Sequence, residues 1–166
     1  MRKLMLTTLC VLFLFSLVYN QKATYVGAKN CKGCHIGPKN SNVYEKWEKA
    51  VHAKAFETLK AKGEEKNPRC LKCHVTGFND GGYKLGSTNA RDFEGVQCES
   101  CHGPGSLYKD IRHMKDELAA VENGLMIPID ALCIKCHNKN SPTFKGFDYQ
   151  TYVKKITHAY RGIKTY

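Results

Sequence analysis

Acidic side chains are scarce in this chain of 166 residues, where 15 aspartates and glutamates face 26 lysines and arginines. No stretch alternates apolar and polar residues long enough to predict a half-buried strand, so a β-sheet protein is not expected. No basic helix or aromatic platform accompanies the lysines, and nucleic-acid binding is therefore not expected either. The longest apolar run, from Leu4 to Val18, has about fifteen residues, fewer than the roughly twenty of a membrane-spanning helix.

That apolar run follows Arg2 and Lys3. A short apolar segment behind two positive charges is typical of a secretory signal peptide, whereas a retained membrane anchor is the alternative that its length disfavours. We expect residues 1–20 to be removed, with cleavage between 20 and 23, although no clear small-residue cleavage site is present. The length of the mature chain, 24–166, suits a single domain. We expect this domain to be periplasmic or otherwise exported and not to be stably inserted in a membrane.

Cysteine, by contrast, is abundant and regularly placed. Eight of the nine cysteines form four Cys-x-x-Cys pairs, each followed directly by histidine: Cys31/Cys34/His35, Cys70/Cys73/His74, Cys98/Cys101/His102 and Cys133/Cys136/His137. The ninth, Cys10, lies in the expected leader. This pattern is the attachment signature of c-type haem, because two thiols at this spacing add to the vinyl groups of one porphyrin and the next residue offers an imidazole to the iron. Zinc ribbons, redox-active dithiols and structural disulfides also use paired cysteines, but none requires the histidine.

Four covalently bound haem c groups change the meaning of the charge. The formal net charge is +11. Loss of the leader, eight propionates and four ferric centres bring it to about +5 oxidised and about +1 reduced. Most of the basic surplus therefore balances propionates, and the remainder suits an acidic redox partner.

Helical periodicity appears in several segments that flank the haem motifs. The pattern predicts a helix over about 42–62, with Asn42 and Glu45 as a capping box, and a second over about 107–123. A short helix from Asp130 should contain the fourth motif, and Asp148 should cap a last one. The expected fold is mainly α, a compact multihaem cytochrome c with helices and irregular loops wrapped around four haems.

Three of the seven histidines lie outside the motifs: His52, His113 and His158. They are the candidate distal ligands, opposite the proximal histidines of the motifs. Three distal histidines cannot serve four irons. One iron is then five-coordinate, or it takes Met114 or Met126.

Longer strings around the motifs resemble the tetrahaem cytochrome c-554 family. They are Cys70-Leu-Lys-Cys-His-Val-Thr-Gly-Phe78, Gly95-Val-Gln-Cys-Glu-Ser-Cys-His-Gly-Pro-Gly105, and Ser141-Pro-Thr-Phe-Lys-Gly-Phe147 followed by His158. The resemblance spans about 25–158. It implies a mainly helical periplasmic electron-transfer protein with haems in stacked and perpendicular pairs, three of them bis-histidine and the second high-spin and five-coordinate.

Carried over by position, the resemblance implies that His113 is the distal ligand of the haem of His35. It likewise implies that His52 is the distal ligand of the haem of His102, and His158 that of the haem of His137. The haem at His74 is left open. Reasoning from the residues alone reaches the number of distal ligands but leaves their pairing undecided. This chain is also markedly shorter than the type member of the family, so a specific partner is not inherited.

The expected function is therefore electron carriage between periplasmic or membrane redox proteins, as a monomer or small oligomer, rather than enzymatic turnover. Two alternatives remain. One is a redox enzyme or ligand-binding protein acting on a small nitrogen species at the haem of His74, and the other is a subunit of an extracellular haem conduit.

Overall fold

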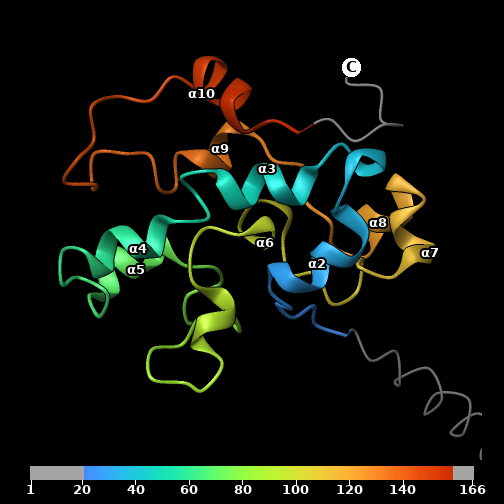
Figure 1. The fold of residues 1–166 in the computed structure, drawn as a ribbon, viewed down its shortest axis with the longest axis horizontal. Helices are drawn as coiled ribbons and strands as arrows, with labels where there is room; N and C mark the ends of the chain where they lie inside the picture. The colour runs from blue at the N-terminus through green and yellow to red at the C-terminus, as the bar shows by residue number, and fades with distance from the viewer. Residues whose placement is uncertain (1–20, 159–166) are drawn as a thin grey trace, which may run out of the picture.

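Short helices joined by irregular loops build the fold, as the computed structural model shows for residues 21–158 (Figure 1). In chain order the helices are α2 (Ala28–His35), η1 (Pro38–Asn40), α3 (Val43–Lys49), α4 (Ala55–Lys60), α5 (Pro68–His74), η2 (Ala90–Phe93), α6 (Cys98–His102), α7 (Ile111–Met114), α8 (Glu117–Glu122), α9 (Asp130–Cys133) and α10 (Tyr149–Ile156). Between residues 21 and 158, β pairing is limited to one isolated bridge, between Val75 and Glu94. The expectation of a mainly helical fold is confirmed.

The expected leader, residues 1–20, lies outside the described residues. Across the described range, no helix combines the length and apolar character needed to cross a membrane.

Three haem motifs sit at the C-terminal ends of helices. α2, α5 and α6 each end at the motif histidine, which is followed by a residue with extended or glycine backbone geometry. The start of α5 follows directly from its sequence: Pro68 occupies the first turn, and the Asn67 side chain accepts a hydrogen bond from the backbone N–H of Arg69. The fourth motif is different, because α9 ends at its first cysteine, Cys133, so the expected helix contains only part of that motif.

The helix expected over 42–62 is broken into α3 and α4. Ala50 has an extended backbone, and the turn at 51–54 places His52 off the helix. The His52 carbonyl accepts the N–H of Val96 at 2.9 Å, a bond to a distant segment that competes with helix continuation. The capping box is also wrong: Asn42 makes no side-chain cap, and the Glu45 carboxylate accepts the Gly37 N–H at 2.9 Å instead.

The helix expected over 107–123 is likewise divided, into α7 and α8. Asp110 and Asp116 each cap a new start by accepting a backbone N–H two or three residues on. Such aspartates favour caps over helix interiors, which explains the break. The predicted cap at Asp148 is confirmed, since its carboxylate accepts the Thr151 N–H at 2.8 Å.

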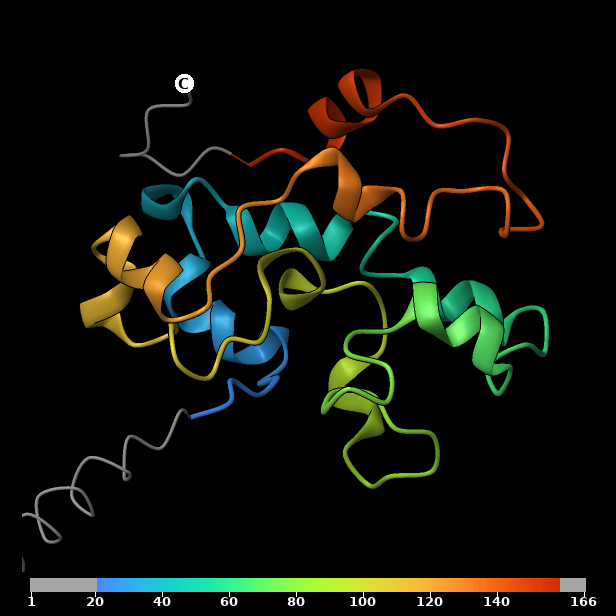
Figure 2. The ribbon, with the colours of Figure 1, turned by 180° about the vertical axis from the view of Figure 1, so that it is seen from behind.

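α6 lies near the middle of the molecule, with α3 beside it and with α2 and the α4–α5 pair on either side (Figures 1 and 2). The largest buried apolar cluster is small and lies around α4 and α5: Phe56, Leu59, Leu71, Val75, Tyr83 and Phe93. Other large apolar side chains around the third and fourth motifs are exposed, including Ile127, Ile129 and Ile134, each more than half exposed. An exposed apolar surface of this extent is normally covered by a bound apolar group or a partner.

Candidate functional site

The eight motif cysteines are free thiols, and six of them lie near a cysteine of another motif. Cys31 lies close enough to Cys98, and Cys73 to Cys136, for the two thiols of each pair to interact. Cys101 and Cys133 interact electrostatically. In a haem-bearing chain these sulfurs stand for thioethers, so the attachment points neighbour one another in the order first, third, fourth and second motif.

Burial acts on the pKa of several of these thiols. It raises the pKa of Cys101 and of Cys133, and it raises the pKa of Cys136 to about 12, with Cys73 adding to the effect. A thioether sulfur carries no charge, so the low-polarity surroundings of these cysteines suit the bonded form.

Backbone carbonyls orient the imidazole rings. Four Nδ1 atoms donate to carbonyl oxygens: His74 to Ala55 at 2.7 Å, His102 to Met126 at 3.1 Å, His113 to Leu107 at 2.8 Å and His158 to Ile156 at 3.2 Å. A carbonyl can only accept, so Nδ1 carries the proton and Nε2 keeps its lone pair for a metal. Both motif and non-motif histidines are prepared in this way.

Two pairs of imidazoles face each other. The ring centres of His52 and His137 lie 5.9 Å apart, and those of His102 and His158 lie 6.1 Å apart. Two metal–nitrogen bonds of about 2 Å, with about 1 Å from each nitrogen to its ring centre, require about 6 Å. The two spacings therefore fit one iron held between each pair of rings, and the donor set fits haem c.

The pairing differs from the one that the resemblance implied. His52 was expected opposite His102 and His158 opposite His137, and the structure exchanges the two partners. The turn at 51–54, held by the bond from the Val96 N–H to the His52 carbonyl, carries His52 in this position. Burial is the largest cause that lowers the pKa of His52 and of His102, although the Met126 carbonyl raises that of His102. A lowered pKa favours the neutral imidazole that a metal ligand must be.

The surroundings of His74 differ from those of the two facing pairs. Its Nδ1 is held by the Ala55 carbonyl at the start of α4, with the Thr58 hydroxyl 3.3 Å away. Met126, one of the two methionines considered as a fourth distal ligand, is bonded through its backbone to His102 of the third motif. Its backbone N–H donates to the His102 carbonyl at 2.9 Å, and its carbonyl accepts from the same residue's ring.

An aromatic stack next to the fourth motif was not found from the sequence. The ring of Phe147 stacks on His137 with centroids 4.6 Å apart, and Tyr152 stacks on Phe147 at 5.3 Å. The Lys155 ammonium lies 4.7 Å from the centre of the Tyr152 ring. This stack fixes the plane of the His137 imidazole.

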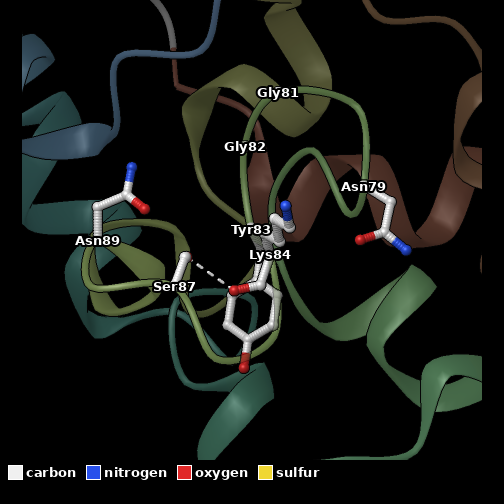
Figure 3. A pocket seen from close by; sticks show the side chains of 7 residues that line it. All are labelled: Asn79, Gly81, Gly82, Tyr83, Lys84, Ser87 and Asn89. Carbon is white, nitrogen blue, oxygen red and sulfur yellow. Dashed lines mark hydrogen bonds between the residues drawn. The ribbon is translucent and has the colours of Figure 1, made fainter.

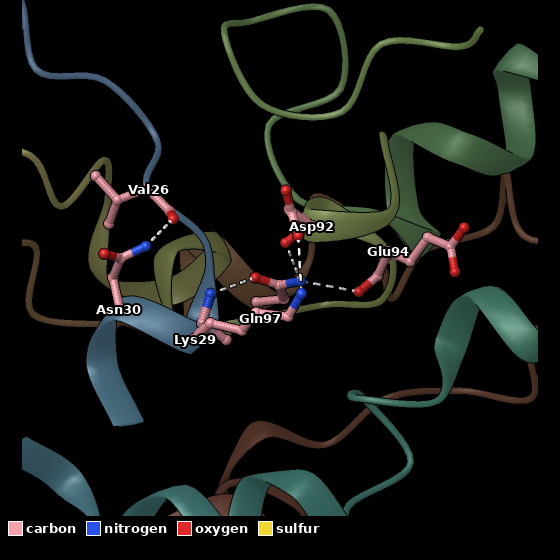
Figure 4. A network of polar contacts seen from close by, with 7 residues as sticks. Val26, Lys29, Asn30, Asp92, Glu94 and Gln97 are labelled. Atoms are coloured by element: carbon pink, nitrogen blue, oxygen red, sulfur yellow. Dashed lines mark hydrogen bonds and ion pairs between the residues drawn. The ribbon is translucent and has the colours of Figure 1, made fainter. Parts of the chain in front are cut away.

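Hydrogen bonds also tie α6 to the other motif segments. The fully buried Thr76, two residues after His74, shares a hydrogen bond of 2.9 Å with the Ser100 hydroxyl inside the third motif. Gln97, which precedes that motif, accepts the Ala28 N–H at 2.7 Å and donates to the carbonyls of Asp92 and Glu94 (Figure 4). Buried polar groups that are fully bonded in this way hold neighbouring elements in one arrangement.

A polar hollow of about 480 Å³ lies in the loop that follows the second motif. Its lining comes from the loop at 79–89 and consists of Asn79, Gly81, Gly82, Tyr83, Lys84, Ser87 and Asn89 (Figure 3). The Ser87 hydroxyl donates to the Lys84 carbonyl at 2.8 Å and closes part of that loop on itself. This hollow belongs to the turn-rich loop and not to the haem motifs.

Comparison with known proteins gives a consistent result. The family described as "Cytochrome c554 and c-prime" matches residues 30–103. Cytochrome c-554 of Nitrosomonas europaea is 31% identical over an alignment of 166 positions that covers 80% of this chain and 68% of that protein. The structure of the reduced state of cytochrome c554 from Nitrosomonas europaea is similar at a TM-score of 0.57 and 27% identity, over 81% of this chain and 79% of that one. The chain therefore belongs to the cytochrome c554 family and is a multihaem c-type cytochrome of electron transfer.

Proposed function

We propose that this protein is a tetrahaem electron carrier with three bis-histidine haems and one five-coordinate haem. The observation that carries the proposal is the pair of facing imidazoles, His52 with His137 and His102 with His158, at the spacing of two axial ligands. Two independent pairs at nearly the same separation are not expected from ordinary packing of surface histidines.

Each motif supplies two thioether bonds and one proximal ligand. The covalent attachments are Cys31 with Cys34, Cys70 with Cys73, Cys98 with Cys101, and Cys133 with Cys136, and the proximal ligands are His35, His74, His102 and His137. His52 serves as distal ligand opposite His137, and His158 opposite His102. His113 is the remaining non-motif histidine, and we assign it to the haem of His35.

The haem of His74 is then left with one axial histidine. Its proximal imidazole is held firmly by Ala55, as an axial ligand requires, while all three non-motif histidines are used elsewhere. An open iron position permits ligand binding, but it does not by itself make the protein an enzyme.

The chain's own contribution to electron transfer is placement. When bound, the haem iron alternates between ferric and ferrous states and carries one electron. The protein keeps the four attachment points adjacent, and it supplies imidazoles on both sides of three irons. A second imidazole lacks the potential-raising thioether of histidine–methionine sites, so three low-potential centres are expected.

The proposal extends to the setting of the protein. Residues 1–20 act as a leader that directs export, and 24–166 form one haem-binding domain in the periplasm or beyond the membrane. The partners are periplasmic or membrane redox proteins that donate and accept electrons, and the chain is a monomer or small oligomer. Redox partners are what an electron-carrying cytochrome of this family requires.

The test is the intact mass of the exported protein, combined with carbon monoxide titration of its reduced form. We expect a polypeptide shortened by about 20 residues that carries four covalent haems, with carbon monoxide binding to at most one of them. Fewer than four haems, or carbon monoxide bound to two or more, would contradict the proposal. A retained leader would contradict only the export part of it.

A further inference from the structure

Glu99 is a carboxylate buried inside the third haem motif, between Cys98 and Cys101, with only 1% of its surface exposed. Its Oε1 accepts the N–H of Gly105 at 2.7 Å and that of Val26 at 2.9 Å. Its Oε2 accepts the N–H of Gly27 at 2.7 Å and, more weakly, that of Val26 at 3.2 Å. Every donor is a backbone amide.

This geometry suits an ionised carboxylate. An ionised carboxyl group only accepts hydrogen bonds, and each Glu99 oxygen faces N–H donors. None of the ion pairs found between residues 21 and 158 involves Glu99. The full negative charge is therefore held in the interior by amide dipoles alone.

The charge lies where two haem attachment points meet. Cys31 and Cys98 lie close together, and Glu99, which follows Cys98 in the chain, acts electrostatically on both. The first intervening residue of the other motifs is not acidic: Lys32, Leu71 and Ile134. Leu71 is equally buried, at 0% exposed, so the same motif position holds an apolar side chain at the second motif and a charge at the third.

We propose that Glu99 lowers the reduction potential of the haem attached at Cys98 and Cys101, and to a smaller extent that of the haem attached at Cys31 and Cys34. A ferric haem carries one more positive charge than a ferrous haem, so a nearby fixed anion stabilises the oxidised form. The effect is strong where water is excluded, because an interior of low dielectric constant screens charges weakly. Electrons in the array are thereby biased away from the first and third motifs and toward the fourth and second.

The inference rests on the proposed haem assignment, and its test uses three variants of the full exported protein. Glu99→Gln removes the charge and keeps the length of the side chain. Glu99→Asp keeps the charge and alters the shape. Glu122→Gln makes the same chemical change on the exposed surface of α8. Each variant is titrated by potentiometry, with the haems followed by electron paramagnetic resonance and optical absorption.

We expect Glu99→Gln to raise the ferrous-to-ferric ratio of the third-motif haem at least threefold at a fixed potential, a positive shift of about 28 mV. Glu99→Asp and Glu122→Gln should leave the ratio unchanged. Equal shifts in Glu99→Gln and Glu99→Asp, or none in Glu99→Gln, would overturn the inference and leave Glu99 as a structural acceptor.

The unsubstituted protein provides a reading that does not depend on whether Glu99→Gln folds. In a redox titration followed by nuclear magnetic resonance, with signals assigned to each haem, the reduction potential of the haem of His102 should be lower than that of the haem of His137. These two haems are compared because each has one motif histidine and one distal histidine as its proposed axial ligands. The reverse order would overturn the inference. Haem count and spin state, measured on the same samples, test the proposed function separately: four haems with the expected ligation but unaltered potentials would refute only the role of Glu99.

Discussion

Replacing Thr76 with valine removes one hydroxyl from a site with 0% exposure and keeps the branched shape of the side chain. The hydroxyl donates to the Gly95 carbonyl at 2.9 Å and accepts the N–H of Gln97, also at 2.9 Å. It also shares a hydrogen bond of 2.9 Å with the hydroxyl of Ser100. The substitution therefore leaves two buried backbone groups and one side-chain hydroxyl without this hydrogen-bond partner at the contact between the second and third motif segments.

Each buried polar group left without a partner costs about 1–3 kcal/mol. The Ser100 hydroxyl can rotate toward another acceptor, so the two backbone groups dominate, and we expect Thr76→Val to lower the free energy of unfolding by about 2–4 kcal/mol. The assay is guanidinium unfolding of the ferric protein with all haems attached, followed by far-ultraviolet circular dichroism.

Thr88→Val is the matched control, because Thr88 is exposed and its hydroxyl makes no hydrogen bond within residues 21–158. Its effect should stay within about 0.5 kcal/mol. Ser100→Ala combined with Thr76→Val should be less destabilising than the sum of the two single changes, since both remove the same hydrogen bond. A loss below about 0.5 kcal/mol for Thr76→Val would refute the view that this hydroxyl holds the two motif segments together.

Three further predictions follow from single contacts. His52→Ala removes the ring opposite His137 and should raise the high-spin share from about one haem in four to about two, and an unchanged spectrum would contradict the pairing. Gly95→Ala should reduce the free energy of unfolding by more than about 1 kcal/mol, because Gly95 has a φ of +82° and an added Cβ would collide with the Ala53 carbonyl; equal stability would count against that tight turn. Burial raises the pKa of Tyr108, so its contribution to stability is present below about pH 10 and is lost as the pH rises through the folded-state pKa. Tyr108→Phe should flatten this alkaline decline in unfolding free energy, and a parallel decline in both proteins would refute it.

The parts of this protein that were predictable from sequence depend on short-range chemistry. Each Cys-x-x-Cys-His motif is contained in five residues, so the multihaem c-type character, which the family confirms, could be predicted from local spacing. The cap at Asp148 is equally local, because its acceptor and the Thr151 N–H lie within one helical turn. The mainly helical fold follows from the absence of strand-like alternation.

The parts that were not predictable depend on long-range contacts. Periodicity favours one continuous helix over 42–62, and the break at 51–54 is fixed by Val96, which lies more than forty residues away. The same turn carries His52, whose ring lies next to that of His137. Spacing gives no information on such pairings, because a distal histidine can reach any motif that the fold brings near.

Glu99 shows a similar limit. In the sequence Glu99 is one of the two residues between the cysteines of a haem motif, as Lys32 is in the first motif. Both are charged, and nothing in the neighbouring sequence predicts that Glu99 is buried. Its burial follows from the segment at 26–27 and from Gly105, which together surround the carboxylate with amide donors.

The most direct test of the central claim is a quantitative electron paramagnetic resonance spectrum of the purified ferric protein. Three pairs of axial histidines and one single axial histidine predict three low-spin haems and one high-spin haem per chain. Four low-spin haems would show that the iron at His74 has a second ligand that we have not assigned. Two or more high-spin haems would show that at least one of His52, His113 and His158 is not an iron ligand.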